Sequence, residues 1–288
     1  MGYQFGDSSG NLSGNQKAKS QTLVGDGLSS STWIGDVYSL GGDSRGGNDL
    51  LIAFSGFNTF FGDAIRMEGR SVGGNDTLTA TDGSNAFYGD ADVMTDRSLG
   101  GNDLLVGGSG FNQVHGDAYI MAMESRGGND VLRAGSGSSN NYLYGDAVNM
   151  RDSSRGGNDV LIGSSGETTM TGDAGSAESA LVNGGNDTLV SGTGDDRMWG
   201  DFREWIAGTL RFGSDIFRFG RNNGNDIIFD FQTGKDKIDL VEKGIASIAQ
   251  LNMSFSGGGV LLDFADDGQI TVIGVSQLVE SDFIFATT

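Results

Sequence analysis

Residues 46–72 read GGNDLLIAFSGFNTFFGDAIRMEGRSV, and this unit decides the fold because the chain repeats it. Its tetrapeptide GGND begins at Gly46, Gly73, Gly100, Gly127, Gly156 and Gly184, so successive copies lie 27, 27, 27, 29 and 28 residues apart. A second signature, the dipeptide GD, alternates with the first at the same period. Two signatures that keep one phase over so much of the chain indicate a repeat architecture.

Each unit contains short β-favouring runs bounded by glycine, for example residues 50–54 and 104–106. Helical periodicity is absent from most of the repeat region. One coil cannot bury its own apolar side, so coils in register stack and share a narrow core. The sequence therefore predicts an all-β protein, a right-handed parallel β-roll or β-helix solenoid. A 27-residue coil could have two or three sides, and we favour two sides with one extended turn.

Stacked coils place equivalent residues in columns about 4.8 Å apart. The column before GD reads Ile34, Phe61, Tyr88, His115, Tyr144, Thr171 and Trp199. A second reads Asn58, Asn85, Asn112, Asn141, Thr168 and Asp196, and a third Met67, Met94, Met121 and Met150. Such ladders of like residues stabilise stacked strands. His115, the one histidine, is expected to fill the aromatic column, because it has no plausible partner set for a Ser-His-Asp site.

The composition points to hard cations as partners. Of 288 residues, 38 are acidic and 18 basic, which gives a formal net charge of -20. This surplus argues against nucleic acid and against an anionic membrane surface. It favours ions that prefer carboxylate and carbonyl oxygens. The chain has no Cys, which excludes disulfides and thiolate metal sites, and no apolar run reaches the length of a membrane span.

The aspartates of the repeat are the candidate metal ligands. We expect the glycine turns to expose carbonyl oxygens through positive φ angles. A file of unpaired carboxylates along one edge would be costly, and Ca²⁺ between successive turns would resolve the repulsion. The alternative is that these aspartates cap turns with their side chains. The candidates on the GGND signature are Gly47, Asp49, Gly74, Asp76, Gly101, Asp103, Gly128, Asp130, Gly157, Asp159, Gly185 and Asp187, with Asp226 on the weaker copy NGND.

The GD column offers a second set of candidates: Asp63, Asp90, Asp117, Asp146, Asp173 and Asp201. These aspartates could bind metal on another edge, or they could hydrogen-bond the glycine-rich turn that follows. The same dipeptide occurs upstream at Asp7, Asp26 and Asp36.

Residues 47–51, GNDLL, fit the centre of the nonapeptide G-G-x-G-x-D-x-U-x, in which U is a large aliphatic residue. With its later copies, this segment resembles the RTX (hemolysin-type calcium-binding repeat) family over residues 32–230. Residues 230–240, DFQTGKDKIDL, resemble the block D-F-x-x-G-x-D-x-I-D-L near the ends of type I-secreted proteins such as RTX proteases, and this serralysin-like likeness covers residues 213–288. The resemblance implies several bound Ca²⁺ ions, export by the type I secretion machinery through an uncleaved C-terminal signal, and an extracellular or cell-surface location.

We interpret the chain as an N-terminal cap (1–31), a β-roll (32–203) and a C-terminal β cap with the secretion segment (204–288). The predicted function is a secreted calcium-binding protein that folds on Ca²⁺ outside the cell and has a structural, surface or adhesion role, not an enzyme. The alternative is a carbohydrate-active enzyme, or the calcium-binding module of one, with a carboxylate site that could use Glu68, Glu124 or Glu204. A third reading is binding of extracellular polysaccharide or a cell surface through the variable last third of each repeat.

Overall fold

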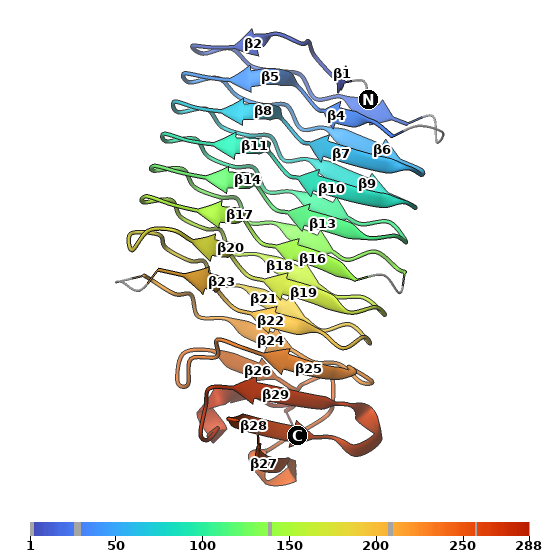
Figure 1. Cartoon of the computed structure of the whole chain (residues 1–288), viewed down its shortest axis with the longest axis vertical. Helices are drawn as coiled ribbons and strands as arrows, with labels where there is room; N and C mark the ends of the chain where they lie inside the picture. The colour runs from blue at the N-terminus through green and yellow to red at the C-terminus, as the bar shows by residue number, and fades with distance from the viewer. Residues whose placement is uncertain (1–2, 26–29, 138–139, 207–209, 257, 288) are drawn as a thin grey trace.

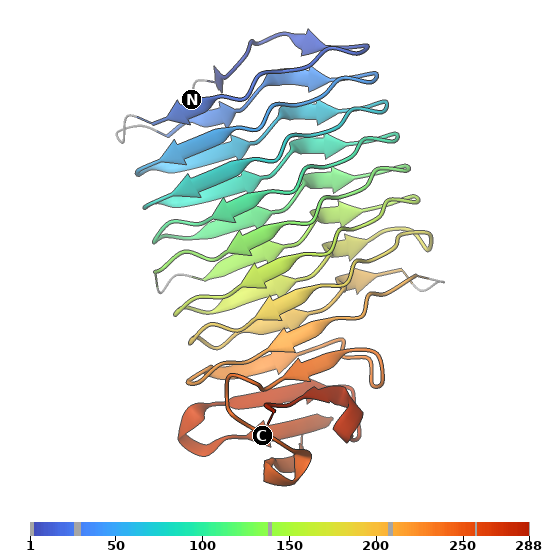
Figure 2. The ribbon, with the colours of Figure 1, turned by 180° about the vertical axis from the view of Figure 1, so that it is seen from behind.

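The computed structural model describes residues 3–25, 30–137, 140–206, 210–256 and 258–287. The chain winds from one end of an elongated body to the other as a solenoid of stacked coils (Figure 1). Almost all regular structure is β, and the strands of neighbouring coils pair in parallel. The predicted all-β parallel solenoid is confirmed. The two-sided coil is wrong, because each coil of the roll contributes to three sheets (Figure 2).

The strands of each sheet stack along the roll in a fixed spatial order. The first contains β1 (Tyr3–Phe5), β4 (Thr32–Ile34), β7 (Phe57–Phe61), β10 (Ser84–Tyr88), β13 (Asn112–His115), β16 (Asn141–Tyr144), β19 (Thr168–Thr171), β22 (Arg197–Trp199), β25 (Asn225–Ile228), β29 (Gln269–Ile273), β28 (Gly259–Asp263) and β27 (Asn252–Ser256). The second contains β2 (Asn11–Leu12), β5 (Val37–Leu40), β8 (Ala64–Met67), β11 (Ala91–Met94), β14 (Ala118–Met121), β17 (Ala147–Met150), β20 (Ala174–Ala177) and β23 (Phe202–Trp205). The third contains β3 (Thr22–Val24), β6 (Leu50–Ala53), β9 (Thr77–Ala80), β12 (Leu104–Val106), β15 (Val131–Arg133), β18 (Val160–Ile162), β21 (Thr188–Val190), β24 (Ile216–Arg218), β26 (Lys237–Asp239) and β30 (Phe283–Ile284).

Strand pairing continues across both expected domain boundaries. β1, β2 and β3 pair with β4, β5 and β6, so residues upstream of 32 form a coil at the end of the stack. Beyond residue 203, β24 and β25 pair with β21 and β22 before the antiparallel strands β27, β28 and β29 close the C-terminal end. Three short 3₁₀ helices lie in this last segment: η1 (Ile248–Gln250), η2 (Ala265–Asp267) and η3 (Glu280–Asp282).

Two apolar clusters run the length of the roll. The larger lies between the first and third sheets, where the aliphatic residue of each nonapeptide is fully buried. Its leucine column comprises Leu51, Leu78, Leu105, Leu132, Leu161 and Leu189. The smaller cluster lines the second sheet with alanine and methionine, among them Ala64 and Met67. Burying one large aliphatic side chain stabilises the fold by about 1.5–3 kcal/mol, so each coil contributes little by itself and stability comes from stacking.

A ladder of asparagines lies at the corner between the third and first sheets. Asn58, Asn85, Asn112 and Asn141 are buried, and each Nδ2 of the first three donates to the Oδ1 of the next, at 3.1, 3.2 and 2.9 Å. The predicted column is confirmed. It satisfies polar groups that would otherwise destabilise the apolar interior.

The aromatic column is also confirmed, with His115 in it. The His115 ring stacks between Tyr88 and Tyr144, with centroids 4.8 and 5.1 Å away. Only 1% of the residue is exposed, and burial lowers the pKa of the imidazole to about 3. Neither ring nitrogen has a hydrogen-bond partner among the described residues. The folded protein therefore holds this histidine neutral.

Replacing His115 with Phe should make the fold less sensitive to acid. The unfolded chain protonates this imidazole near pH 6.5, so its contribution to stability is present above that pH and is lost as pH falls towards 3. Between pH 7.5 and 5.0 the native chain should lose about 2 kcal/mol more unfolding free energy than His115→Phe, by denaturant titration at saturating Ca²⁺. The carboxylates are common to both proteins, so equal losses would contradict a buried neutral histidine.

Candidate metal centre

The aspartates of GGND form a continuous file inside the roll. Each backbone N–H donates to Oδ1 of the equivalent aspartate in the next coil, for example Asp76 to Asp103 at 2.7 Å. The same bond recurs along the file, at 2.6 to 3.1 Å. It joins Asp49, Asp76, Asp103, Asp130, Asp159, Asp187, Asp215 and Asp236. One oxygen of each side chain is thereby fixed in place. The other stays available except in Asp236, whose Oδ2 accepts from the N–H of Gln232 at 2.7 Å.

The aspartates of GD form a second file beside the first. Their carboxylates accept from the second glycine of the GGND turn in the same coil: Asp90 accepts from Gly101 at 2.9 Å and Asp117 from Gly128 at 2.8 Å. The equivalent pairs are Asp36 with Gly47, Asp63 with Gly74, Asp146 with Gly157, Asp173 with Gly185, and Asp201 with Gly213. The structure shows the second alternative, in which these carboxylates hydrogen-bond the glycine turn. The same carboxylates lie next to the GGND file and not on another edge.

The glycines beside the two files, such as Gly89 of the GD signature, are required by close approach. A methyl group on Gly89 would lie 1.7 Å from the carbonyl oxygen of Gly116 and 2.2 Å from Oδ2 of Asp103. A side chain at this position would fill the small space between the carbonyl oxygen of Gly116 and the carboxylate of Asp103. The expected positive φ is not the reason, because the described glycines with positive φ lie elsewhere, at the loop tips and corners and in the C-terminal cap.

Most of the aspartates in the two files have one carboxylate oxygen without a partner. Both files are buried, with at most 3% of any of these aspartates exposed. Among the described residues, a buried Oδ without a hydrogen bond occurs on Asp36, Asp49, Asp76, Asp90, Asp103, Asp117, Asp130, Asp146, Asp159, Asp173, Asp187 and Asp215. Buried carboxylates normally find donors or cations, since an unpaired one carries a large desolvation cost. The two files place many such carboxylates in a row, and no basic side chain in the described part of the protein neutralises most of them.

Burial and mutual repulsion act together on these groups. Burial, followed by the charges of Asp63 and Asp103, raises the pKa of the Asp76 carboxyl well above its usual range. Burial and the charge of Asp36 raise the pKa of Asp49 to about 8. Burial raises the pKa of Asp117 to about 6, against hydrogen bonds that lower it. Without a cation, the files favour protonated carboxyl groups, and a bound cation would favour the ionised form.

This donor set fits a hard divalent cation. The two atoms nearest to the space at Gly89 are a carbonyl oxygen, of Gly116, and a carboxylate oxygen, Oδ2 of Asp103. Calcium takes roughly six to eight such ligands at about 2.3–2.6 Å in flexible geometry, and it tolerates a mixture of side-chain and backbone donors. Within the described residues, no three side chains of Asp, Glu, His or Cys converge on one point. An ion here would combine aspartates of the two files with carbonyls of the glycine turns.

Sequence reasoning missed the residues at the C-terminal end of the files. Asp215 follows Gly213-Ser214 at a spacing of 28 from Asp187, so the repeat could have found it. Asp236 lies only 21 residues further on and had no such signal. There Lys235 Nζ donates to the carbonyl of Phe212 at 2.6 Å and to Oε1 of Gln232 at 3.3 Å. The ammonium also lowers the pKa of Asp201, which burial nevertheless holds at about 7. A side-chain cation therefore ends the carboxylate files.

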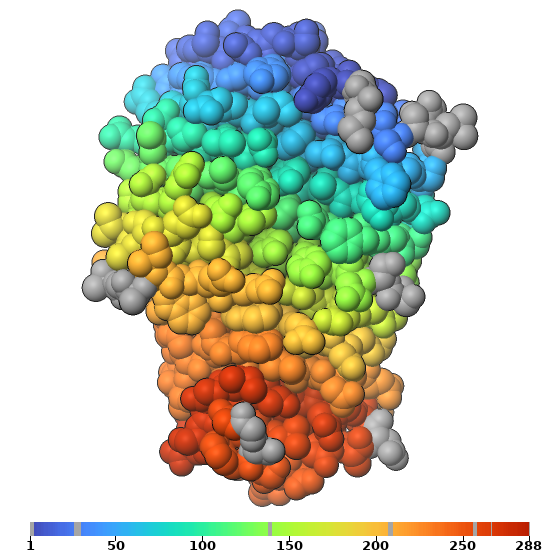
Figure 3. Space-filling model, in the orientation of Figure 1, coloured from blue at the N-terminus to red at the C-terminus, as the bar shows by residue number. Residues whose placement is uncertain are grey.

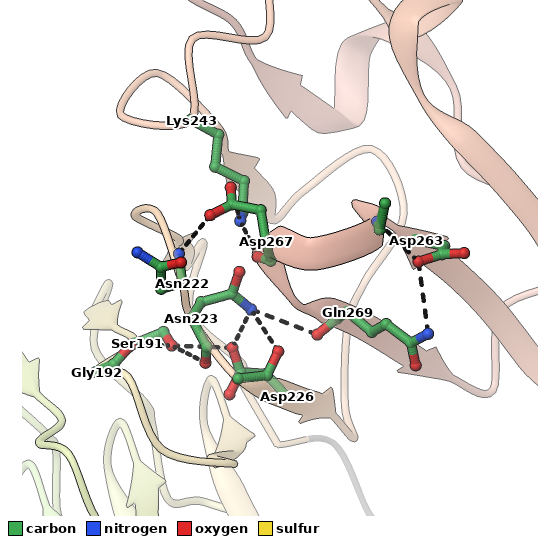
Figure 4. Close-up of polar contacts among 11 residues, drawn as sticks. Ser191, Gly192, Asn222, Asn223, Asp226, Lys243, Asp263, Asp267 and Gln269 are labelled. Carbon is green, nitrogen blue, oxygen red and sulfur yellow. Dashed lines mark hydrogen bonds and ion pairs between the residues drawn. The ribbon is translucent and has the colours of Figure 1, made fainter.

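Asp226 lies outside both files. It belongs to β25 in the first sheet, where its Oδ1 accepts from the N–H of Asp196 at 2.8 Å. Its Oδ2 accepts from Ser191 Oγ and Asn223 Nδ2, at 2.9 and 2.6 Å (Figure 4). NGND thus lies at the corner of the asparagine ladder and not at the corner of the GGND turns. It resembles GGND in sequence but occupies a different position in the coil. Asp26 lies outside the described residues.

A parallel β-solenoid with glycine turns and buried aspartate files defines a calcium-binding repeat protein. The family model of the RTX calcium-binding nonapeptide repeat (4 copies) matches residues 72–93 and 98–118, and these repeats bind calcium ions. The model of the Peptidase M10 serralysin C terminal matches residues 117–287, more than half of the chain, which therefore belongs to this family. Both predicted resemblances are confirmed. No curated protein matches the chain. No helix in the described ranges has the length and apolarity to cross a membrane.

Replacing Asp103 with Asn should weaken calcium-dependent folding. Asn keeps the Oδ1 that accepts from Asp76 but removes the charge and replaces the unpartnered oxygen by an amide. The midpoint of a Ca²⁺ titration should rise by roughly 3–10-fold, because ligand charge sets calcium affinity, and fewer ions should bind. Asp92→Asn, in β11 of the neighbouring second sheet and half-exposed, is the control and should stay within about 2-fold. Unchanged midpoint and stoichiometry in Asp103→Asn would rule out this ligand.

Proposed function

We propose that this chain is a secreted calcium-binding β-roll that is exported unfolded, folds on Ca²⁺ outside the cell and serves a structural or surface role there. The observation that carries the proposal is the row of buried carboxylate oxygens without partners in both aspartate files. The ligands proposed are the aspartates of the two files from Asp49 to Asp201, with Asp215 added and Asp226 left out, together with carbonyls of the GGND glycines.

The energetics support folding that depends on calcium. Ordering a coil costs conformational entropy at every residue, while its share of the two narrow apolar clusters is small. At low calcium, repulsion within the files adds to that cost. Where calcium is abundant, binding energy becomes folding energy, because the unfolded chain has no site formed. The chain would thus stay extended inside the cell and fold after export.

The C-terminal segment supports export by the type I route. The match to the serralysin C terminal extends to residue 287, and such domains are typical of secreted proteins. The antiparallel strands β27, β28 and β29 cap the first sheet there, so the same segment would serve as signal and as cap.

A structural role agrees with where the candidate catalytic groups lie. Glu68 and Glu124 are exposed side chains in ion pairs with Arg66 and Arg97, at 3.1 and 3.0 Å. His115 is buried in the aromatic column. The serralysin name comes from a protease family, but the matched region here is a roll of stacked coils whose successive bands form one continuous body (Figure 3).

Far-UV circular dichroism of the full chain tests the proposal. In chelator the chain should be largely unfolded, and Ca²⁺ should produce a cooperative gain of β signal that Mg²⁺ does not reproduce, since Mg²⁺ demands near-octahedral geometry and sheds water reluctantly. Analytical ultracentrifugation in the same buffers should show the change from an expanded to a compact particle. Complete β structure in chelator, indifferent to Ca²⁺, would overturn the proposal and leave the aspartates as turn caps.

A further inference from the structure

A file of cations lies on the outside of the roll. After each loop tip of the second sheet the chain returns through a single parallel bridge, and these bridges stack into a ladder. We call it the return ladder: Lys17, Arg45, Val72, Leu99, Arg126, Arg155, Asn183 and Arg211. Five of its eight residues are basic and exposed, although the chain has only 18 basic residues in 288. At about 4.8 Å per coil, the ladder spans roughly 34 Å along the roll.

These cations lack the partners that other arginines nearby have. At the loop tips, Arg70 pairs with Asp43 at 2.7 Å and Arg97 with Glu124 at 3.0 Å, each across neighbouring coils. Among the described residues, no ion pair includes a basic residue of the return ladder. Moreover, Arg126 and Arg155 are direct neighbours in register. Like charges opposite one another destabilise a sheet, so an anion on this ladder would relieve a repulsion built into the free protein.

Hydrogen-bond donors line the same track. The third residue of each GGND lies three positions beyond the ladder residue, and these exposed asparagines form their own ladder: Asn48, Asn75, Asn102, Asn129, Asn158 and Asn186. Each Oδ1 accepts from a backbone N–H of the next coil, for example Asn75 Oδ1 from Asn102 at 2.9 Å. Their acceptors are thus occupied. The Nδ2 groups of Asn129, Asn158 and Asn186 each donate one N–H to the preceding Oδ1, at 3.1 to 3.2 Å, which leaves the second N–H of each amide for a ligand. Shallow hollows also adjoin the cations, one of them lined by Arg155, Asn183 and Arg211.

We propose that the return ladder binds a linear acidic polysaccharide, whose chain runs along the roll with its carboxylates on the guanidinium groups and its hydroxyls on the asparagine amides. Guanidinium binds carboxylate through two parallel hydrogen bonds, which favours arginine for this contact. This inference rests on the proposed function, because such polymers are met outside the cell.

The shape of the cationic surface favours a thin polymer over a membrane or nucleic acid. The ladder is one residue wide, and the exposed loop tips beside it carry acids such as Asp96 and Asp152. A flat anionic membrane would meet those acids together with the arginines. Nucleic acid carries phosphates densely, and a chain of net charge -20 repels them. A polymer with widely spaced charges can follow the return ladder without contacting those acids. Val72 and Leu99 form an uncharged interval within the ladder.

The test is binding of the calcium-folded full chain to hyaluronan, a linear polymer in which uronate alternates with an uncharged N-acetylated amino sugar. Neutral dextran is the reference. Binding should be measured by isothermal titration calorimetry at low and physiological salt. The native chain should bind hyaluronan and not dextran. Arg126→Gln with Arg155→Gln should weaken binding by at least 10-fold, since two charge-assisted contacts are lost. The matched control, Arg66→Gln with Arg97→Gln, removes the same charge from ion-paired positions and should stay within about 2-fold.

Three outcomes would overturn the inference: no hyaluronan binding, equal weakening in both double variants, or preference for phosphatidylserine vesicles or duplex DNA over hyaluronan. Circular dichroism of the same samples separates this failure from failure of the proposed function, because a chain that folds on Ca²⁺ without binding hyaluronan refutes only the ladder. If the Arg126 and Arg155 double variant does not fold, Lys17→Gln with Arg45→Gln at the other end provides the same comparison.

Discussion

The structure depends on electrostatic repulsion inside a stack. Coils of nearly equal length place each aspartate of the two files above its counterpart, and the strand spacing of about 4.8 Å brings like charges close together in a buried space. The apolar clusters on either side exclude water, which would otherwise screen them. A parallel solenoid with this sequence is consequently incomplete as a polypeptide. Its interior needs positive charge from outside, and the glycine turns leave the room for it.

The repeat period predicted most of the architecture because columns follow directly from it. The aromatic, asparagine and methionine columns all appear in the strand registers. The predicted number of sides was wrong, and the error has a physical cause. In β8 only the first and fourth residues, Ala64 and Met67, are buried, so the alternation that marks a strand in sequence is absent. For the site, spacing found the two aspartate columns but could not show that they adjoin. Asp226 was misplaced because three of the four letters of NGND match GGND. Asp215 was missed because its turn lacks the first glycine and the asparagine.

The two ends of the files differ in chemistry. At the C-terminal end the side-chain ammonium of Lys235 supplies a positive charge next to Gln232 and Asp201. Antiparallel strands cover the last coil there. At the N-terminal end Gln21 stands in the position of an aspartate and donates its N–H to Asp49 at 2.6 Å. The charge density of the files therefore falls at both ends. Outside, Arg70 and Arg97 at the loop tips pair with acids, whereas no basic residue of the return ladder has an ion pair among the described residues.

The coil length varies in loops where the variation leaves the aspartate files unchanged. Four residues separate β14 from the ladder residue Arg126, whereas five separate β20 from Asn183. Likewise, five residues connect β12 to β13 and seven connect β15 to β16. Yet the bonds from one aspartate to the next keep their length through these coils. Insertions are thus absorbed at loops remote from the metal oxygens. The roll can acquire or lose loop segments during evolution, and foreign peptides can be grafted there, while the ion sites stay in register.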